Sequence, residues 1–210
     1  RVYMTQPMGG GALREFTWAQ TLDEARRMAA HLKAQGYPPG SRIAILSKNC
    51  AHFILSDLAI WMAGYVSVAL YPTSSPETIQ YILEHSESKL MFVGKLDHFE
   101  AKAMVPEGMP CISYPLSPKT DYPKWDDIIK STNPIEGSPT RDKDDTALLI
   151  YTSGSTGQPK GVEHTFASTV AGPKGAIKIF SLTNNDRFIS YLPLAHVFER
   201  AAVEVATCLA

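Results

Sequence analysis

The sequence has few of the residues that mark several large classes of protein. It contains three cysteines in 210 residues, Cys50, Cys111 and Cys208. Their odd number and wide spacing argue against a disulfide framework and against a cysteine zinc site. Each lies among apolar or small residues, so we expect three small buried hydrophobic side chains in a reducing, cytoplasmic setting. The six histidines form no metal-ligand pattern either.

An excess of charge of one sign is also missing. Lysine and arginine number 20 against 21 aspartates and glutamates, for a formal net charge of −1. No overall field would therefore recruit nucleic acid, and we predict no nucleic-acid partner. No apolar run approaches the roughly 18–20 residues of a membrane span, and no signal-peptide pattern opens the chain.

What remains is the composition of an ordinary globular protein, with 44% hydrophobic and 20% charged residues. This is enough chain for a well-buried core. The chain begins at Arg1 without an initiator methionine and stops at Ala210 within a helix-like pattern. We therefore expect it to be a piece of a longer protein.

Hydrophobic periodicity predicts alternating helices and strands. The predicted strands cover residues 42–46, 66–70, 90–93 and 111–114. The predicted helices cover residues 17–36, 51–63, a segment opened by Ser75 and Pro76, 96–104 and 125–129. Thr17 and Gln20 form a capping-box signature at the start of the first helix, whose inner face includes Leu22, and Gly64 is expected to end the second. This alternation is typical of the α/β class, with parallel β-sheets and helices on both faces. Ligands of such sheets bind beyond the carboxyl ends of the strands.

Changes in composition divide the chain into four parts. Residues 1–15 are polar and glycine-rich, which predicts a flexible start in a loop conformation. Residues 16–130 form a first α/β part. Residues 131–145 have few apolar side chains and are predicted to be a surface linker, and residues 146–210 form a second α/β part.

The second part is predicted to contain a strand, a helix, a second strand and a second helix, over residues 147–151, 165–180, 187–191 and 196–209. The pair Gly172-Pro173 lies within the first of these helices. Proline cannot donate the backbone hydrogen bond of a helix, so we expect a break or a kink there.

The most informative stretch follows the strand 147–151 and reads Thr-Ser-Gly-Ser-Thr-Gly-Gln-Pro-Lys-Gly over residues 152–161. Its small residues allow close approach of backbone N–H groups to an anion and add hydroxyl donors. They are Ser153, Gly154, Ser155, Thr156 and Gly157. Lys160 can place a positive charge on the outer phosphates of a nucleotide. The stretch therefore predicts a phosphate-binding loop.

Two other interpretations of this loop fit less well. A Walker A loop requires a lysine directly after its second glycine, whereas Gln158 follows Gly157 here. A flexible Ser/Gly linker would have polar residues on both sides, whereas an apolar strand pattern precedes this loop.

The loop resembles, residue for residue, the signature T-S-G-[ST]-T-G-x-P-K-G of the acyl-adenylate-forming superfamily. That superfamily includes acyl-CoA synthetases, peptide-synthetase adenylation domains and firefly luciferase. Further segments are similar to other core segments of the family, at residues 16–18, 40–46, 63–72 and 191–200. The last has the form seen in long-chain fatty acid–CoA ligases. The resemblance implies the N-terminal domain of the adenylate-forming fold, incomplete and without the mobile C-terminal domain.

The resemblance also implies a reaction and its participants. A fatty acid would be activated with ATP and Mg²⁺ to acyl-AMP, and coenzyme A would then accept the acyl group as a thioester. Residues 153–157 would hold the β- and γ-phosphates, and Lys160 would steady the leaving pyrophosphate. Thr152 would help to hold Mg²⁺. His196 would line the acyl pocket beside the reacting carboxylate, so Lys160 and His196 are the candidate catalytic residues.

Several of these residues also have simpler interpretations. His196 can instead cap the start of a helix. Glu199 and Arg200 either contact the substrate or, as we expect, form a structural pair on the helix. His164 is expected to be a surface or helix-cap residue.

Other functions also stay open. One is an adenylating enzyme for aromatic or amino acids, and another is a non-catalytic nucleotide-binding or scaffolding fragment. The family motifs that contact adenine and ribose, and the late catalytic lysine, are absent and are expected beyond Ala210. The 210 residues alone are therefore expected to be inactive. Peripheral contact with a membrane and assembly into a homodimer are not decided by the sequence.

Overall fold

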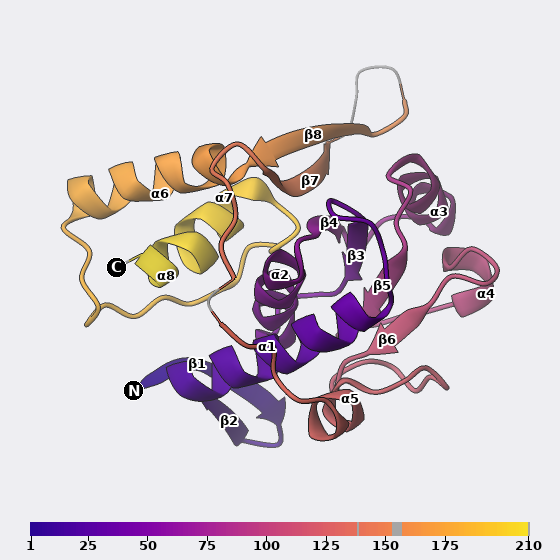
Figure 1. Ribbon diagram of the computed structural model, residues 1–210, viewed down its shortest axis with the longest axis horizontal. Coiled ribbons are helices and arrows are strands. Elements are labelled where there is room, and N and C mark those ends of the chain that lie inside the picture. Colours follow the sequence, from indigo (N-terminus) through magenta and orange to yellow (C-terminus); the bar gives the residue numbers. More distant parts are fainter. Residues whose placement is uncertain (138, 153–156, 210) are drawn as a thin grey trace.

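The computed structural model describes residues 1–137, 139–152 and 157–209. Its centre is a six-stranded sheet with the strand order β6-β5-β3-β4-β7-β8 (Figure 1). The strands are β3 (Arg42–Leu46), β4 (Val66–Leu70), β5 (Leu90–Val93), β6 (Cys111–Ser113), β7 (Thr146–Thr152) and β8 (Lys160–Thr165). The first five are parallel, which confirms the α/β prediction, but β8 pairs antiparallel with β7. We did not predict this edge strand.

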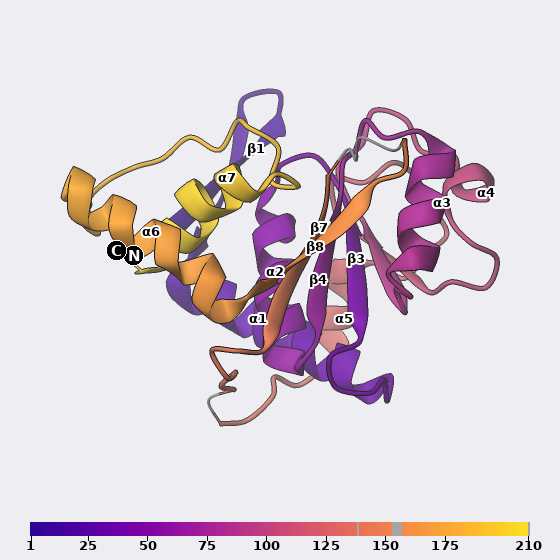
Figure 2. The ribbon, with the colours of Figure 1, turned by 90° about the horizontal axis from the view of Figure 1, so that it is seen from above.

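Helices cover both faces of the sheet (Figure 2). One face packs against α1 (Trp18–Ala34), α2 (Ala51–Ala63) and α5 (Trp125–Ser131), and the other against α3 (Pro76–His85) and the short helix α4 (Ala101–Met104). Strand β3 leads into α2 on the first face, whereas β4 leads into α3 on the second. The two connections therefore diverge at the carboxyl edge of the sheet, where open α/β sheets form their binding crevice.

Local sequence signals explain where the helices begin and end. The predicted capping box of α1 is present. The Thr17 hydroxyl accepts a hydrogen bond from the Gln20 backbone N–H, and the Gln20 side-chain oxygen accepts one from the Thr17 backbone N–H. Ser75 caps α3, with Pro76 in its first turn. Leu22, predicted on the inner face of α1, is 43% exposed, and Thr21 is buried instead.

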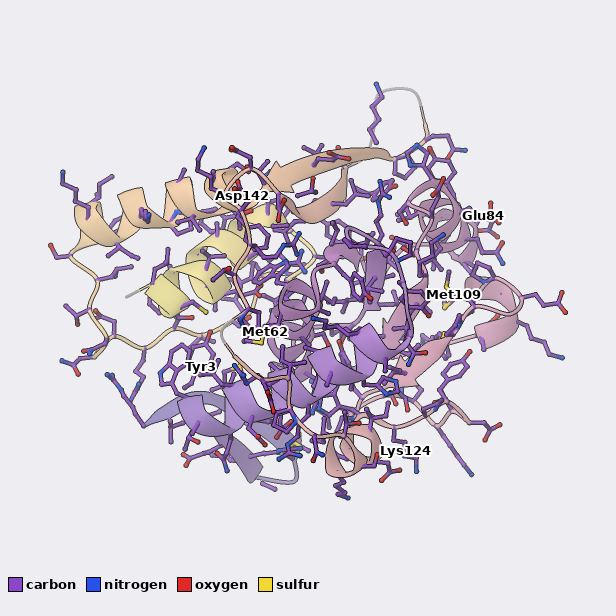
Figure 3. All side chains as sticks on the ribbon, viewed as in Figure 1. Tyr3, Met62, Glu84, Met109, Lys124 and Asp142 are labelled. Carbon is purple, nitrogen blue, oxygen red and sulfur yellow. The ribbon has the colours of Figure 1, made fainter. Side chains whose placement is uncertain are left out.

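The beginning of the chain corrects the prediction of a loop. Strands β1 (Val2–Gly9) and β2 (Ala12–Thr17) form an antiparallel hairpin, with the glycine tract at its turn. Tertiary contacts support it. Tyr3 stacks on Trp18 with ring centroids 3.7 Å apart, and the Gln6 side chain accepts from the Ala51 backbone N–H. Figure 3 shows Tyr3 on the side of the molecule where the chain ends, and its hydroxyl lies 3.1 Å from that of Thr207.

The connection before β7 packs on α1. Where described, residues 132–145 contain no helix or strand. The guanidinium of Arg26 donates to the carbonyls of Ile135 and Gly137, and that of Arg27 donates to the carbonyl of Thr132. The strands of both predicted α/β parts nevertheless belong to one sheet, because β7 pairs with β4.

Three further predictions along the chain need correction. The helix expected over residues 96–104 is limited to α4. Helix α6 (Phe166–Phe180) is not broken at Pro173, whose side chain is buried, whereas the alternative of a kink there stays a prediction. No strand forms at residues 187–191, where Ile189 and Tyr191 are 83% and 76% exposed. An extended segment becomes a strand only with a partner strand, and none of the described residues provides one.

The last predicted helix is present in three continuous pieces. They are α7 (Val197–Glu199), a π-helical segment η1 (Arg200–Val205) and α8 (Ala206–Leu209). Cys50 and Cys111 are buried as predicted, but Cys208 on α8 is exposed, so that prediction is wrong. No helix in the described ranges has the length and apolar character needed to cross a membrane.

Candidate active site

The β7–β8 hairpin holds the two ends of the predicted phosphate loop. Thr152, the last residue of β7, pairs directly with Lys160, the first residue of β8. Both residues are exposed at the carboxyl edge of the sheet. The antiparallel ladder therefore places a hydroxyl and a lysine opposite each other. Ser153, Gly154, Ser155 and Thr156 lie outside the described residues.

Steric constraints explain why two positions of the signature are glycine. Gly157 has a φ of +87°, in the left-handed region that favours glycine. Gly161 pairs with Tyr151, and a Cβ atom there would lie 3.2 Å from Cζ of the Tyr151 ring and 3.1 Å from Cδ1 of Leu149. The glycine after the lysine thus lets β8 lie close to the aromatic residue that precedes the loop.

Tyr151 anchors the end of β7 to α3. Its hydroxyl lies 2.7 Å from Nδ1 of His85, and its side chain is 3% exposed. Burial raises the pKa of Tyr151 to about 12, so the phenol stays neutral at physiological pH. We did not predict this pair. The only signal for it was an aromatic residue at the end of an apolar strand.

His196 caps the N-terminus of α7. Its Nδ1 accepts from the Phe198 backbone N–H at 3.2 Å, so the simpler of the two predicted interpretations is present. The ring is exposed, and Nε2 has no partner among the described residues. The cap therefore orients the ring and leaves its second nitrogen available to a ligand.

The segment before His196 is tied to the carboxyl end of β3. Asn49, in the turn between β3 and α2, forms hydrogen bonds to Ser190, Leu192 and Leu194. Leu194 is 2% exposed and packs in the core against α2. The segment before His196 and the two described ends of the phosphate loop, Thr152 and Lys160, are thus both attached at the carboxyl edge of the sheet.

The predicted pair between Glu199 and Arg200 is wrong. The Glu199 carboxylate accepts from the Ser190 hydroxyl at 2.8 Å. Arg200 Nη2 donates instead to both carboxylate oxygens of Asp57 on α2, at 2.9 and 2.6 Å. Adjacent residues on a helix do not face each other, which explains why Arg200 finds its partner on another helix. His164, expected to be a surface or helix-cap residue, lies half-buried in β8.

The Arg200 site is a fully buried cluster of charges. Arg200, Asp57 and Glu204 are each at most 1% exposed, and Arg200 Nη2 also donates to the Ser67 hydroxyl. Arg200 Nε lies 3.7 Å from a Glu204 carboxylate oxygen. Burial and the nearby Asp57 charge raise the pKa of Glu204 well above its usual range. Burial also raises the pKa of Asp57, and the nearby Arg200 charge partly offsets that rise.

Among the described residues, no group of three or more His, Cys, Asp or Glu side chains is arranged to bind a metal ion. The exposed Thr152 hydroxyl is a neutral oxygen ligand, which suits Mg²⁺. Mg²⁺ commonly keeps water molecules and substrate phosphates as its other ligands. Thr152 therefore fits one position around a Mg²⁺ ion that arrives with a nucleotide.

A mostly parallel sheet with Thr152 and Lys160 paired at its carboxyl edge, at the two ends of a Ser/Gly sequence motif, is typical of the α/β proteins that bind nucleotides. Residues 2–210 match the family of AMP-binding enzymes, and the chain belongs to this family.

Known relatives agree with this assignment. The chain is 32% identical over 200 residues to the long-chain-fatty-acid–CoA ligase FadD15 of Mycobacterium bovis, covering 91% of the chain and 33% of the relative. It is 28% identical over 186 residues to the mitochondrial malonate–CoA ligase ACSF3 of Mus musculus, covering 86% and 31%. The chain thus spans about one third of the length of these curated relatives.

A solved structure shows the same fold. The o-succinylbenzoate coenzyme A synthetase MenE of Bacillus subtilis, in complex with ATP and magnesium ion, matches with a TM-score of 0.75 and 28% identity. The match covers 93% of this chain and 49% of that chain.

Proposed function

We propose that the protein containing this segment activates a carboxylic acid with ATP and transfers the acyl group to coenzyme A. The observation that carries the proposal is the β7–β8 hairpin, which places Thr152 opposite Lys160 at the two ends of the signature loop. Family membership and the ATP and magnesium ion bound to the related MenE support it.

The first step brings two anions together. A carboxylate oxygen attacks the α-phosphorus of ATP, the bond from that phosphorus to the oxygen bridging the β-phosphate breaks, and pyrophosphate leaves. Loop residues 153–157 hold the β- and γ-phosphates, and the Lys160 ammonium stabilises the charge that develops on the leaving pyrophosphate. Thr152 would hold one position around Mg²⁺, which when bound would neutralise phosphate charge.

The second step releases the acyl group. The sulfur of coenzyme A, having lost its proton, attacks the acyl carbonyl carbon, and AMP leaves with the oxygen that linked it to the acyl group. His196 lines the acyl pocket beside the reacting carboxylate in this proposal. Its exposed ring, oriented by the α7 cap, is the supporting observation.

The proposed acid is a fatty acid. Residues 191–200 have the form seen in long-chain fatty acid–CoA ligases, and FadD15 is a relative of that class. The similarity to ACSF3 and MenE makes malonate and o-succinylbenzoate reasonable competitors. ATP–pyrophosphate exchange with fatty acids of graded length, malonate, aromatic acids and amino acids separates these classes. Exchange with an amino acid alone would reject the fatty acid.

The phosphate role is tested with Lys160→Ala in the full-length protein, next to Lys178→Ala on α6 as a matched exposed lysine. We expect Lys160→Ala to slow ATP–pyrophosphate exchange by about 100- to 1000-fold, because one positioned charge on the leaving group is lost. The melting temperature should not change, since Lys160 is exposed. Equal exchange rates for the two variants would remove Lys160 from the mechanism.

A non-catalytic nucleotide-binding protein remains the competing function. It predicts that the full-length protein binds ATP but gives no exchange with any acid. Binding measured by calorimetry beside the exchange assay distinguishes the two functions.

A further inference from the structure

We propose that Asn49 is a positioning residue that holds the chain segment leading to His196 and thereby places His196 against the acid substrate. The proposal rests on the proposed function, because it concerns the same acyl site. It adds a residue from the opposite half of the chain, which does not belong to the loop or to the segment that carries His196.

Asn49 uses both ends of its side-chain amide. Nδ2 donates to the Ser190 hydroxyl at 2.8 Å and to the Leu192 carbonyl at 2.6 Å, and Oδ1 accepts from the Leu194 backbone N–H at 2.9 Å. The three contacts fall on alternate residues, so one side chain follows an extended segment over five positions. Only an amide offers two donors and an acceptor in this arrangement.

The turn that carries Asn49 is itself fixed. The Lys48 backbone N–H donates to the Lys95 carbonyl at 2.8 Å, and the Lys95 backbone N–H donates to the Ser47 hydroxyl at 3.0 Å. The turn after β3 is thus tied to the turn after β5. Asn49 therefore presents its amide from the rigid carboxyl edge of the sheet.

The segment that it holds has few contacts of its own. Residues 186–192 have no regular secondary structure, and most of their side chains are exposed. Only with Leu194 and Ala195, which are 2% and 1% exposed, does the chain re-enter the core. The hydrogen bonds from the Asn49 amide therefore fix the position of residues 190–194, which lead the chain back to the core.

A second anchor follows His196. The Arg200 backbone N–H donates to the His196 carbonyl at 3.3 Å, and the Arg200 side chain is held by Asp57. His196 thus lies between two attachments to the first half of the chain, Asn49 before it and Asp57 after it. Loosening the first attachment should move the histidine without removing it.

The test uses a graded pair of variants in the full-length protein. Asn49→Asp keeps the shape and the acceptor for Leu194 but loses both donors, and Asn49→Ala removes all three hydrogen bonds. Asn184→Ala replaces an exposed asparagine in the connection before the held segment and is the matched control.

We expect kcat/KM for the acid to fall by about tenfold in Asn49→Asp and about a hundredfold in Asn49→Ala, because a misplaced group loses its alignment with the substrate. KM for ATP should stay within about twofold, since the phosphate loop is untouched. Amide hydrogen exchange of a peptide covering residues 190–196 should accelerate in both Asn49 variants. Neither change is expected in Asn184→Ala.

The outcomes separate this inference from the proposed function. If the wild type is active but the Asn49 variants lose kcat/KM for acid and ATP equally, or not at all, the positioning role is overturned. A wild type without exchange for any acid rejects the proposed function and the catalytic part of this inference together. In that case, hydrogen exchange over residues 190–196 still shows whether Asn49 holds the segment.

Discussion

Residues 16–152 and residues 160–209 are stabilised in different ways. In the first region, every residue of β4 and β5 is buried, and α2 is buried along most of its length. Each fully buried Leu, Ile or Phe side chain contributes about 1.5–3 kcal/mol, so this region has a large apolar contribution to its stability.

The second region buries much less apolar surface. Among the described side chains of α6, only that of Pro173 is buried. Large apolar side chains on α6, in the connection to α7 and on α7 are 60–83% exposed, namely Ile179, Phe180, Ile189, Tyr191 and Phe198. Polar contacts from the first region, made by Asn49 and Asp57, attach this part of the chain instead.

The two regions therefore differ in what stabilises them. Burial of apolar side chains on both faces of the sheet stabilises the first region, whereas a few polar contacts hold the second region in place. Several large apolar side chains of the second region therefore stay exposed, whereas those of the first region are mostly covered. Substitutions in the two regions should therefore have different consequences.

The largest effect is expected at the buried ion pair between the regions. Asp57→Ala leaves the Arg200 guanidinium without its main partner, which typically costs about 3–5 kcal/mol of unfolding free energy. Urea denaturation measures the loss, and amide exchange over residues 197–209 locates it. Asp97→Ala breaks the exposed pair with Lys48 and should cause no measurable change.

A double variant tests the cause of that loss. Adding Arg200→Met to Asp57→Ala should recover part of the stability, because no unpaired guanidinium then remains buried. If Asp57→Ala behaves like Asp97→Ala, the ion pair does not anchor the second region.

A smaller effect is expected from truncating apolar side chains, and it should depend on the region. Leu55→Ala on the fully buried face of α2 should lower the unfolding free energy by about 2–5 kcal/mol. Ile179→Ala, at a side chain that is 77% exposed, should stay within about 0.5 kcal/mol and reduce self-association in sedimentation experiments. Similar losses of unfolding free energy in Leu55→Ala and Ile179→Ala would contradict the difference between the two regions.

The smallest effect concerns the pH dependence of the first region. Desolvation, with a smaller contribution from Arg14, lowers the pKa of His52 to about 3. At a pH between about 3 and 6.5, His52 is therefore protonated in the unfolded chain and neutral in the folded protein. The free energy of unfolding should fall as the pH drops from 6.5 towards 3, by about 2 kcal/mol at pH 5.

The contribution of His52 is isolated by comparing the wild type with His52→Leu across this range. The variant should lose this part of the pH dependence, whereas His98→Leu at an exposed histidine should keep it. The raised pKa of Glu204 acts in the opposite direction, since stability from its bound proton is lost as the pH rises through the folded pKa. A wild-type slope that persists in His52→Leu would exclude His52 as its source.

Local signals predicted much of the fold. The capping box at Thr17 and Gln20, the glycine at the end of α2 and the apolar strands 42–46 and 66–70 appear where expected, because each depends on neighbours within one or two turns. For the phosphate loop, the resemblance to the family signature named Lys160 and Thr152, which pair at its two described ends, and their roles stay predictions.

Elements that depend on distant partners could not be predicted. The β1–β2 hairpin is supported by contacts with α1 and α2, and residues 187–191 lack a partner strand among the described residues despite their strand-like pattern. Asp57 and Arg200 are separated by 143 positions, and nothing near either residue indicates the other.

By itself, the sequence determined the α/β class, the order of most elements and the loop that identifies the AMP-binding family, because helix caps, strand patterns and a contiguous motif are local properties of the chain. Only the tertiary structure decided that β8 returns antiparallel and that Asn49 and Asp57 hold the segment around His196. Those features depend on side chains that meet only after folding, when burial makes an unpaired amide or charge costly and so selects one partner for each.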